Sequence, residues 1–191
     1  LMEKLKNHSG RDSVRVFRPC DVHATTHCWR MAMENMETPT ALIFSRQNIK
    51  DLPSGTDYES GVRRGAYEVV HEANPDVILV ASGSEVSTLA DTAALLANDG
   101  IKARVVSCPS EGLFRRQPKE YQESLLPTDF PIFGLTAGLP ITFEGLVGNK
   151  GKVHGLESFG FSAPYKVLDE KLGYTAENIY REVKEYLGGL A

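Results

Sequence analysis

Residues 75–110 read PDVILVASGSEVSTLADTAALLANDGIKARVVSCPS, and this stretch decides the fold. Residues 77–80 form an unbroken apolar run rich in β-branched side chains, which predicts a strand covered on both faces. Ser84 follows the small residues that end this run, and its hydroxyl can accept a hydrogen bond from an unpaired amide in the first turn of a helix. Apolar residues then recur at helical spacing up to Gly100, which is placed to end the helix in a left-handed conformation. Residues 102–107 supply a second strand, so the stretch predicts a βαβ unit with a right-handed crossover.

The alternation of strands and helices continues on both sides of this unit. Upstream, we expect strands at residues 14–18 and 40–44, joined by a helix that Asp21 caps. Downstream, we expect strands at residues 67–70, 131–136 and 152–156, a broken helix at residues 113–126, and two helices that start near Pro164 and Thr175. The helix after Pro164 carries apolar residues that we expect to be buried, namely Val167, Leu168 and Leu172. This order predicts an α/β sheet with helices on both faces.

Residues 50–64, KDLPSGTDYESGVRR, differ in composition from the segments on either side. They hold a proline and glycines among polar residues and show neither the helical nor the strand period. We interpret them as an interdomain linker, so that a second domain begins at residue 65. Residues 138–152 are glycine-rich and indicate no single element.

Composition limits the classes of protein to which the chain can belong. Its 191 residues suffice for one full domain and a piece of another, and 41% hydrophobic with 24% charged residues is an ordinary globular balance. A net charge of -4 gives no electrostatic reason to expect nucleic acid. No apolar run approaches a membrane span, and the first twenty residues lack a signal-peptide core. Three cysteines favour reduced thiols in the cytoplasm. The chain opens on Leu1 instead of Met, so we expect it to be a fragment or a processed piece.

Several collinear motifs make the chain resemble the C-terminal part of transketolase over residues 14–187. They are FRPCD at 17–21, PTALIFSRQN at 39–48, SGSEV at 82–86, RVVSCPS at 104–110, LFRRQPKEYQESLLP at 113–127, ESFGFSAP at 157–164 and LGYTAENI at 172–179. The resemblance implies that residues 1–49 are the tail of the pyrimidine-binding domain, residues 50–64 the linker and residues 65–191 the C-terminal domain. It also implies a three-layer C-terminal domain with a five-stranded, mostly parallel sheet that contains one antiparallel strand.

The same resemblance implies an activity for the full-length protein. Transketolases are cytoplasmic homodimers that move a two-carbon ketol unit between phosphorylated ketoses and aldoses. Thiamine diphosphate carries this chemistry, together with Mg²⁺ or Ca²⁺. In the family, the diphosphate, the metal and the acid–base residues lie upstream of the part that this chain matches. We therefore expect no catalytic residue, cofactor or metal on this chain, no activity from it alone, and no nucleic-acid or membrane partner.

Arg46 is the strongest candidate for a functional residue. It follows a buried-type strand, and open α/β sheets place ligands at the carboxyl ends of their strands. A guanidinium offers a planar fork of donors that suits a phosphate. The segment Ser45-Arg46-Gln47-Asn48 matches the transketolase motif whose Arg holds the phosphate of the sugar substrate. The alternative is a surface Arg at the end of a strand.

Other candidate sites have simpler structural explanations. Gly83 and Ser84 at a helix N-terminus form a weaker candidate for an anion site, and helix capping without a ligand is the alternative. A metal cluster can be drawn from Cys20, His23, His27 and Cys28. We favour two buried thiols on a partly solvated helix, because Cys28 points away from the other three and a structural zinc site needs four ligands.

The remaining candidate side chains are expected to be structural. They are Cys108, His71 and His154, and the histidines have no partner visible in the sequence. Residues 135–138 read Leu-Thr-Ala-Gly where transketolases commonly carry Val-Glu-Ala-Gly, so no role of that Glu transfers to this chain.

Two other functional classes remain open. One is a non-catalytic oligomerisation or anion-binding module that shares only the fold. The other is the C-terminal part of a different thiamine diphosphate enzyme, such as a deoxyxylulose phosphate synthase or a keto-acid dehydrogenase β subunit. The combination of FRPCD, SRQN and FGFSAP favours transketolase.

Overall fold

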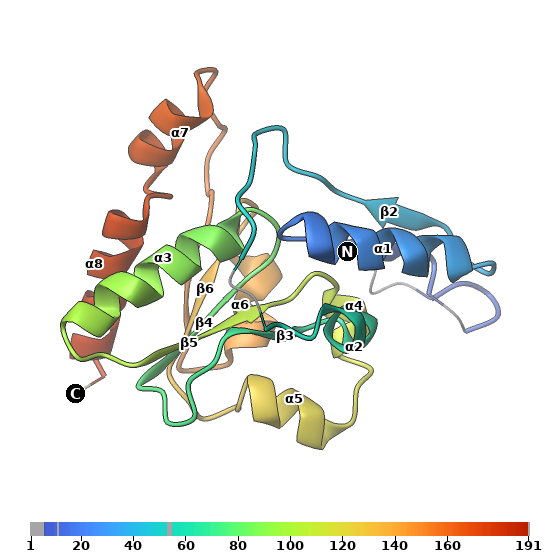
Figure 1. Cartoon of the computed structure of the whole chain (residues 1–191), viewed down its shortest axis with the longest axis horizontal. Helices are drawn as coiled ribbons and strands as arrows, with labels where there is room; N and C mark the ends of the chain where they lie inside the picture. The colour runs from blue at the N-terminus through green and yellow to red at the C-terminus, as the bar shows by residue number, and fades with distance from the viewer. Residues whose placement is uncertain (1–5, 11, 53–54, 191) are drawn as a thin grey trace.

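The computed structural model describes residues 6–10, 12–52 and 55–190, so parts of the predicted N-terminal tail and linker lie outside the described residues. In chain order the elements are β1 (Arg15–Phe17), α1 (Val22–Glu34), β2 (Thr40–Leu42), α2 (Tyr58–Arg64), β3 (Tyr67–Val70), β4 (Val77–Ala81), α3 (Glu85–Asn98), β5 (Ala103–Ser107), α4 (Glu111–Phe114), α5 (Lys119–Leu125), β6 (Ile132–Leu135), α6 (Ile141–Val147), β7 (Lys152–His154), α7 (Tyr165–Leu172) and α8 (Ala176–Gly188) (Figure 1). They form a small N-terminal unit and a larger α/β domain.

The larger domain is built on one five-stranded sheet in the order β3-β5-β4-β6-β7. Strand β3 runs antiparallel to β5, and the other neighbouring pairs are parallel. Val77 of β4 stands opposite Ala103 of β5, with α3 between the two strands in the chain. The βαβ unit and the mostly parallel sheet with one antiparallel strand are therefore confirmed.

Helices cover both faces of this sheet and give the domain three layers. Val77 and Leu79 of β4 belong to a core that includes buried side chains of α3 and α8. Ile78 and Val80 belong to a second core with buried side chains of α4, α5 and α6. Successive strand residues point to opposite faces, so this division shows one helical layer on each side. Helices α3 and α8 lie side by side (Figure 1).

The N-terminal unit is a two-stranded parallel sheet with α1 as its crossover. Strands β1 and β2 pair with Arg15 opposite Thr40. The Asp21 carboxylate accepts a 2.8 Å hydrogen bond from the backbone N–H of Ala24, which confirms the predicted cap. Ala24 and Cys28 of α1 are fully buried in the same core as the α3 side of the large sheet. The small unit is thus packed against the domain.

The left-handed helix end predicted at Gly100 is confirmed, and Gly173 ends another helix in the same way, whereas the cap at Ser84 is wrong. Gly100 and Gly173 adopt φ of 76° and 81° after α3 and α7. Ser84 has φ -59° and ψ -28°, and its side chain makes no capping hydrogen bond. A capping serine needs an extended backbone to aim its hydroxyl at the first turn, and Ser84 is already helical. Its hydroxyl lies 3.4 Å from Glu85 Oε1 instead.

The predicted linker and the helix near Pro164 also differ from expectation. Residues 58–64 of the linker form α2, which Asp57 caps and Gly65 ends with φ 86°. Helix α7 buries none of its residues, and Val167 on its predicted buried face is 49% exposed. It extends away from the sheet (Figure 1). A helical period identifies an apolar face without showing that anything covers it.

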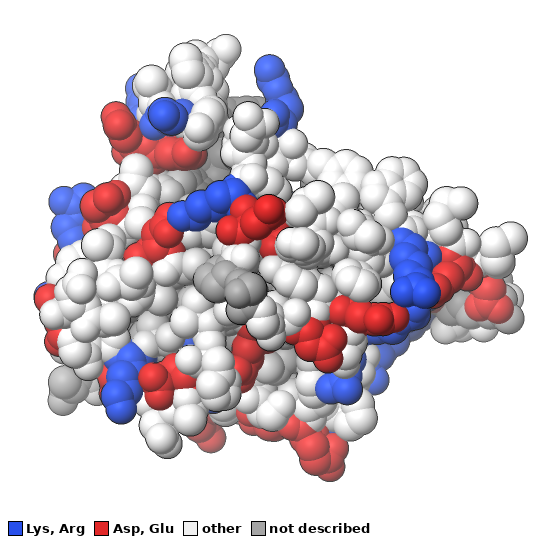
Figure 2. All heavy atoms as spheres, in the orientation of Figure 1, with Lys and Arg blue, Asp and Glu red and all other residues white. Residues whose placement is uncertain are grey.

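No helix in the part of the chain that the structure describes is both long and apolar enough to cross a bilayer. On the face shown in Figure 2, basic and acidic side chains are interspersed over the surface.

Candidate functional site

Arg46 lies in the exposed segment that follows the carboxyl end of β2. The strand ends at Leu42, and Arg46 follows four residues later in a bend with an exposed side chain. Its guanidinium forms no hydrogen bond or ion pair with any residue that the structure describes. The geometry therefore leaves the full donor fork of Arg46 available to an anion.

The residues that follow Arg46 line a cavity of about 480 Å³. We call it the α3–α7 cavity, and it is formed by three segments: Gln47, Asn48, Ile49 and Lys50; Ser84, Glu85, Ser87 and Thr88; and Tyr165, Leu168, Asp169, Leu172 and Tyr174, with Ala137 and Leu156 completing it. Ser84 follows β4 and Ala137 follows β6, so the cavity lies beyond the carboxyl ends of two adjacent parallel strands. In the sheet, β5 lies on one side of β4 and β6 lies on its other side, so the direction of the strand order reverses at β4. Open α/β sheets bind ligands at such a reversal.

Arg18 occupies the turn at Gly83, the weaker anion-site candidate. Its Nη2 lies 2.9 Å from Glu85 Oε2, and its Nη1 donates a 3.1 Å hydrogen bond to the Ser82 carbonyl. The N–H of Gly83 donates to the Arg18 carbonyl at 3.0 Å. Gly83 has φ 67°, and a Cβ there would lie 3.0 Å from the Arg18 guanidinium. Contacts within the protein therefore occupy this turn, and anion binding at Gly83 and Ser84 stays a prediction.

The cysteines and histidines in and just before α1 do not gather around a common point. Cys20 and Cys28 are fully buried, whereas His23 is exposed and lies against the ring of Tyr58 at 5.4 Å between centroids. Burial raises the pKa of Cys20 to about 11 and that of Cys28 to about 12, so both thiols hold their protons at neutral pH. In the described part of the chain, no three metal-ligating side chains come together.

His154 has a partner that the sequence did not reveal. Its Nδ1 lies 3.0 Å from Glu182 Oε1, and its Nε2 lies 3.1 Å from the Leu172 carbonyl oxygen. The ring of Tyr174 packs edge-on against it at 4.9 Å. These contacts connect β7 to α7 and α8, so His154 has a structural role. Glu182 is 28 residues away in the chain, and no local pattern connects the two.

The position where transketolases commonly carry Glu is filled by a buried threonine. Thr136 is 4% exposed, and its hydroxyl accepts a hydrogen bond from the N–H of Gly138 at 3.1 Å. Its carbonyl accepts one from the Tyr174 hydroxyl at 2.8 Å. Thr136 thus holds a turn together and carries no ionisable group.

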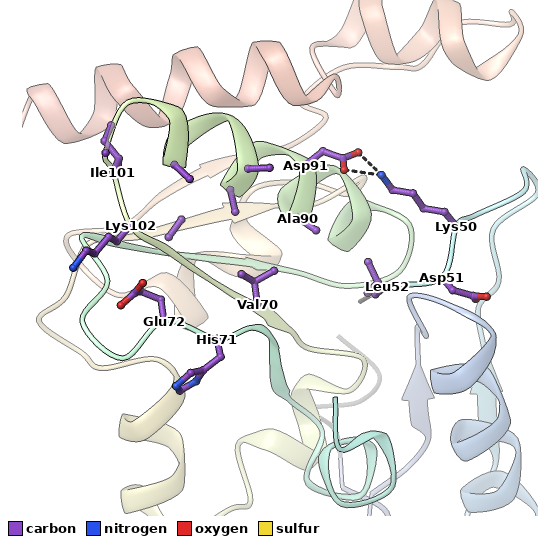
Figure 3. Close-up of a pocket in the computed structure, with 15 residues that line it drawn as sticks. Lys50, Asp51, Leu52, Val70, His71, Glu72, Ala90, Asp91, Ile101 and Lys102 are labelled. Carbon is purple, nitrogen blue, oxygen red and sulfur yellow. Dashed lines mark hydrogen bonds and ion pairs between the residues drawn. The ribbon is translucent and has the colours of Figure 1, made fainter. Parts of the chain in front are cut away.

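A second cavity, of about 850 Å³, lies between α3 and the edge strand β3 (Figure 3). Its walls are mostly small aliphatic side chains, and Val70 points into it from β3. At one end Lys50 Nζ lies 2.6 Å from Asp91 (Figure 3). His71 stands at the rim, 76% exposed, beside Glu68. Sequence reasoning missed this cavity, because it depends on how α3 and β3 are placed.

Comparisons with known proteins agree with the motifs. Residues 65–175 match the family model described as the transketolase-like TK C-terminal domain. A transketolase 2 from Vibrio parahaemolyticus is 37% identical over 177 residues, covering 92% of this chain and 27% of the relative. A transketolase from Staphylococcus epidermidis is 38% identical over 186 residues, which cover 96% of this chain and 28% of the relative. The solved transketolase from Leishmania mexicana matches with a TM-score of 0.85 and 36% identity, covering 94% of this chain and 26% of that chain. The chain thus spans little more than a quarter of the length of these relatives, and it belongs to the transketolase family.

Proposed function

We propose that this chain is the C-terminal part of a transketolase that transfers a two-carbon ketol unit between phosphorylated ketoses and aldoses. One observation carries the proposal: the chain matches transketolases over 92–96% of its length, including the SRQN segment outside the C-terminal domain. A pure scaffold has no need of that segment. Related solved transketolases from Pichia stipitis, 29% identical to this chain, are described as complexes with xylulose-5-phosphate and sedoheptulose-7-phosphate.

In this proposal Arg46 binds the phosphate of the sugar. Its support is the exposed position beyond β2 and the absence of a competing carboxylate on its guanidinium within the described residues. An Arg–phosphate contact with two parallel N–H···O bonds fixes both the charge and the orientation of the substrate. Arg46 thus positions the substrate.

We assign thiamine diphosphate and its Mg²⁺ or Ca²⁺ to parts of the protein outside this chain. This assignment is supported by the relatives, of which the chain matches little more than a quarter; among the residues described, no three metal-ligating side chains come together. When bound elsewhere, the cofactor supplies the carbanion that carries the two-carbon unit. The residues of this chain position substrate and pack the domains.

An exposed apolar surface on the N-terminal unit supports the presence of further protein. Trp29 is 50% exposed and lies against Phe44, with ring centroids 6.3 Å apart. Met33 and Ile43 are 72% and 48% exposed. A two-stranded sheet with such a surface is marginal alone, so we propose that upstream domain segments cover it. Homodimerisation and a cytoplasmic location belong to the same proposal, the latter supported by three free cysteines.

The test is a two-carbon transfer assay on the full-length protein and on the 191-residue chain. With thiamine diphosphate and Mg²⁺, the full-length protein converts phosphorylated ketose and aldose pairs, and the chain alone does not. Calorimetry of the chain with the same cofactor and metal shows no saturable heat. A full-length protein inactive on all sugar pairs would favour the non-catalytic module, and saturable binding by the chain would contradict the assignment of the cofactor.

A further inference from the structure

We propose that the α3–α7 cavity binds a small organic cation, with Asp169 as the carboxylate that holds its ammonium group. The cavity has the size of a small-molecule site and is built from three segments of the chain. Nothing in the proposed transfer reaction assigns a ligand to it.

One helical face of α7 forms a wall of the cavity. Tyr165, Leu168, Asp169 and Leu172 line it at intervals of three and four residues. Leu168 and Leu172 provide an apolar surface, and Tyr165 adds an aromatic ring on which a cation can pack. The face therefore combines one charge with an apolar wall, which suits an amphipathic amine.

The charges that face the cavity leave one carboxylate uncompensated. Glu85 is paired with Arg18 at 2.9 Å, and Lys50 lies 2.6 Å from Asp91. Asp169 makes no side-chain hydrogen bond or ion pair with the residues described. Its pKa is raised, first by burial and second by the negative charge of Glu85. A ligand with a positive charge removes this repulsion, whereas a phosphate or carboxylate adds to it.

The hydrogen-bonding groups around Asp169 also suit an ammonium. A primary ammonium has three donors and no acceptor. Asp169 can accept one of them, and Gln47 and Asn48, whose side-chain amides carry carbonyl acceptors, also line the cavity. A neutral alcohol of the same shape satisfies fewer of these acceptors. The cavity should therefore discriminate by charge as well as by size.

The test is a titration of the 191-residue chain with benzylamine, benzyl alcohol and benzoate, followed by amide NMR shifts. Benzylamine binds saturably and shifts amides around Ser84 and Asp169. Benzyl alcohol binds at least about tenfold more weakly, as expected from the loss of a charged hydrogen bond, and benzoate does not bind. Asp169→Asn lowers benzylamine affinity by about tenfold to a hundredfold.

Two further variants keep the test decisive. Glu170→Gln removes an exposed carboxylate next to Asp169 on α7 and should leave the affinity unchanged. Ala137→Phe fills part of the cavity from the loop after β6 and should weaken binding without touching any charge. The proposal is overturned by equal affinities for amine and alcohol. It is also overturned if Asp169→Asn has no effect, or if Glu170→Gln costs as much affinity as Asp169→Asn.

Discussion

The guanidinium of Arg18, in the N-terminal unit, lies 2.9 Å from Glu85 Oε2 at the start of α3 in the large domain. The Glu85 side chain is only 9% exposed, so the pair is shielded from water on the carboxylate side. This ion pair joins the segment after β1 to the turn after β4 and lies beside the α3–α7 cavity. The pair is therefore one of the contacts between the two units, beside the core that they share.

Arg18→Ala should lower the free energy of unfolding by about 2–3 kcal/mol, because it leaves a buried carboxylate without its charged donor. Arg30→Ala is the matched control. The Arg30 side chain is 57% exposed and pairs with Glu34 and Glu59 at the surface, so its loss should cost less than about 1 kcal/mol. Urea unfolding of the two variants measures both values. Equal losses would mean that the Arg18–Glu85 pair is no stronger than a surface pair.

Substitutions at two glycines distinguish the energetic cost of backbone strain from the cost of a steric clash. Gly100 has φ 76° and open space at its Cβ position, so Gly100→Ala should cost only the strain of a left-handed residue, about 1–2 kcal/mol. Gly65 has φ 86°, and a Cβ there would lie 2.4 Å from the Ser110 carbonyl oxygen and 2.5 Å from the Phe114 amide nitrogen. Gly65→Ala should therefore cost well over 3 kcal/mol or prevent folding. Thermal unfolding of both variants shows which one loses more stability. Similar losses of stability would show that the backbone around Gly65 shifts to accommodate the added Cβ.

Alkaline pH should destabilise the chain through its buried thiols. The pKa values of Cys20 and Cys28 are raised by burial to about 11 and about 12, from 9.0. Above pH 9 the unfolded chain releases thiol protons that the native chain retains. The stability that these thiols give is therefore complete below pH 9 and is lost as pH rises toward about 11 for Cys20 and about 12 for Cys28. Each thiol contributes a slope of up to about 1.4 kcal/mol per pH unit.

Cys28→Ala distinguishes the effect of this thiol on stability from that of the tyrosines, which titrate in the variant and in the unmodified chain alike. Urea unfolding between pH 8 and about 11 should give a shallower loss of stability in the variant than in the unmodified chain. Parallel curves would show that Cys28 ionises equally in the folded and unfolded states.

The sequence predicted the features that depend on local patterns. The β-branched run of β4 indicated a strand covered on both faces, and all five of its residues are buried. Asp21 and Gly100 marked a helix start and a helix end because capping is a local interaction. The motif that contains Arg46 also placed this residue beyond a strand, as the structure has it.

Features that depend on contacts between residues far apart in the chain could not be predicted from the sequence. Arg18 and Glu85 are 67 residues apart, and no local pattern in the sequence connects them. The α3–α7 cavity needs three segments that only the fold brings together. For α7 the helical period identified an apolar face, but this face is covered only in part, since Val167 is exposed and Leu168 and Leu172 are half-buried.

The final prediction concerns Arg46 in the full-length protein. The phosphate that we propose for it lies at the far end of the sugar from the reacting carbon, so the contact should be similar in the ground and transition states. Arg46→Ala should then raise KM for phosphorylated donors far more than it lowers kcat. The loss of a charged hydrogen bond predicts a fall in kcat/KM of about tenfold to a hundredfold. Arg46→Lys should recover only part of it, because an ammonium lacks the bidentate fork.

Unphosphorylated ketose donors distinguish substrate binding from a structural role. They carry no phosphate, so Arg46→Ala should leave their kcat/KM nearly unchanged. Arg30→Ala, which removes an exposed arginine on α1, should leave KM unchanged for both kinds of donor. If Arg46→Ala instead lowers kcat/KM equally for phosphorylated and unphosphorylated donors, Arg46 supports the local structure beyond β2, and the phosphate contact must be made by another residue.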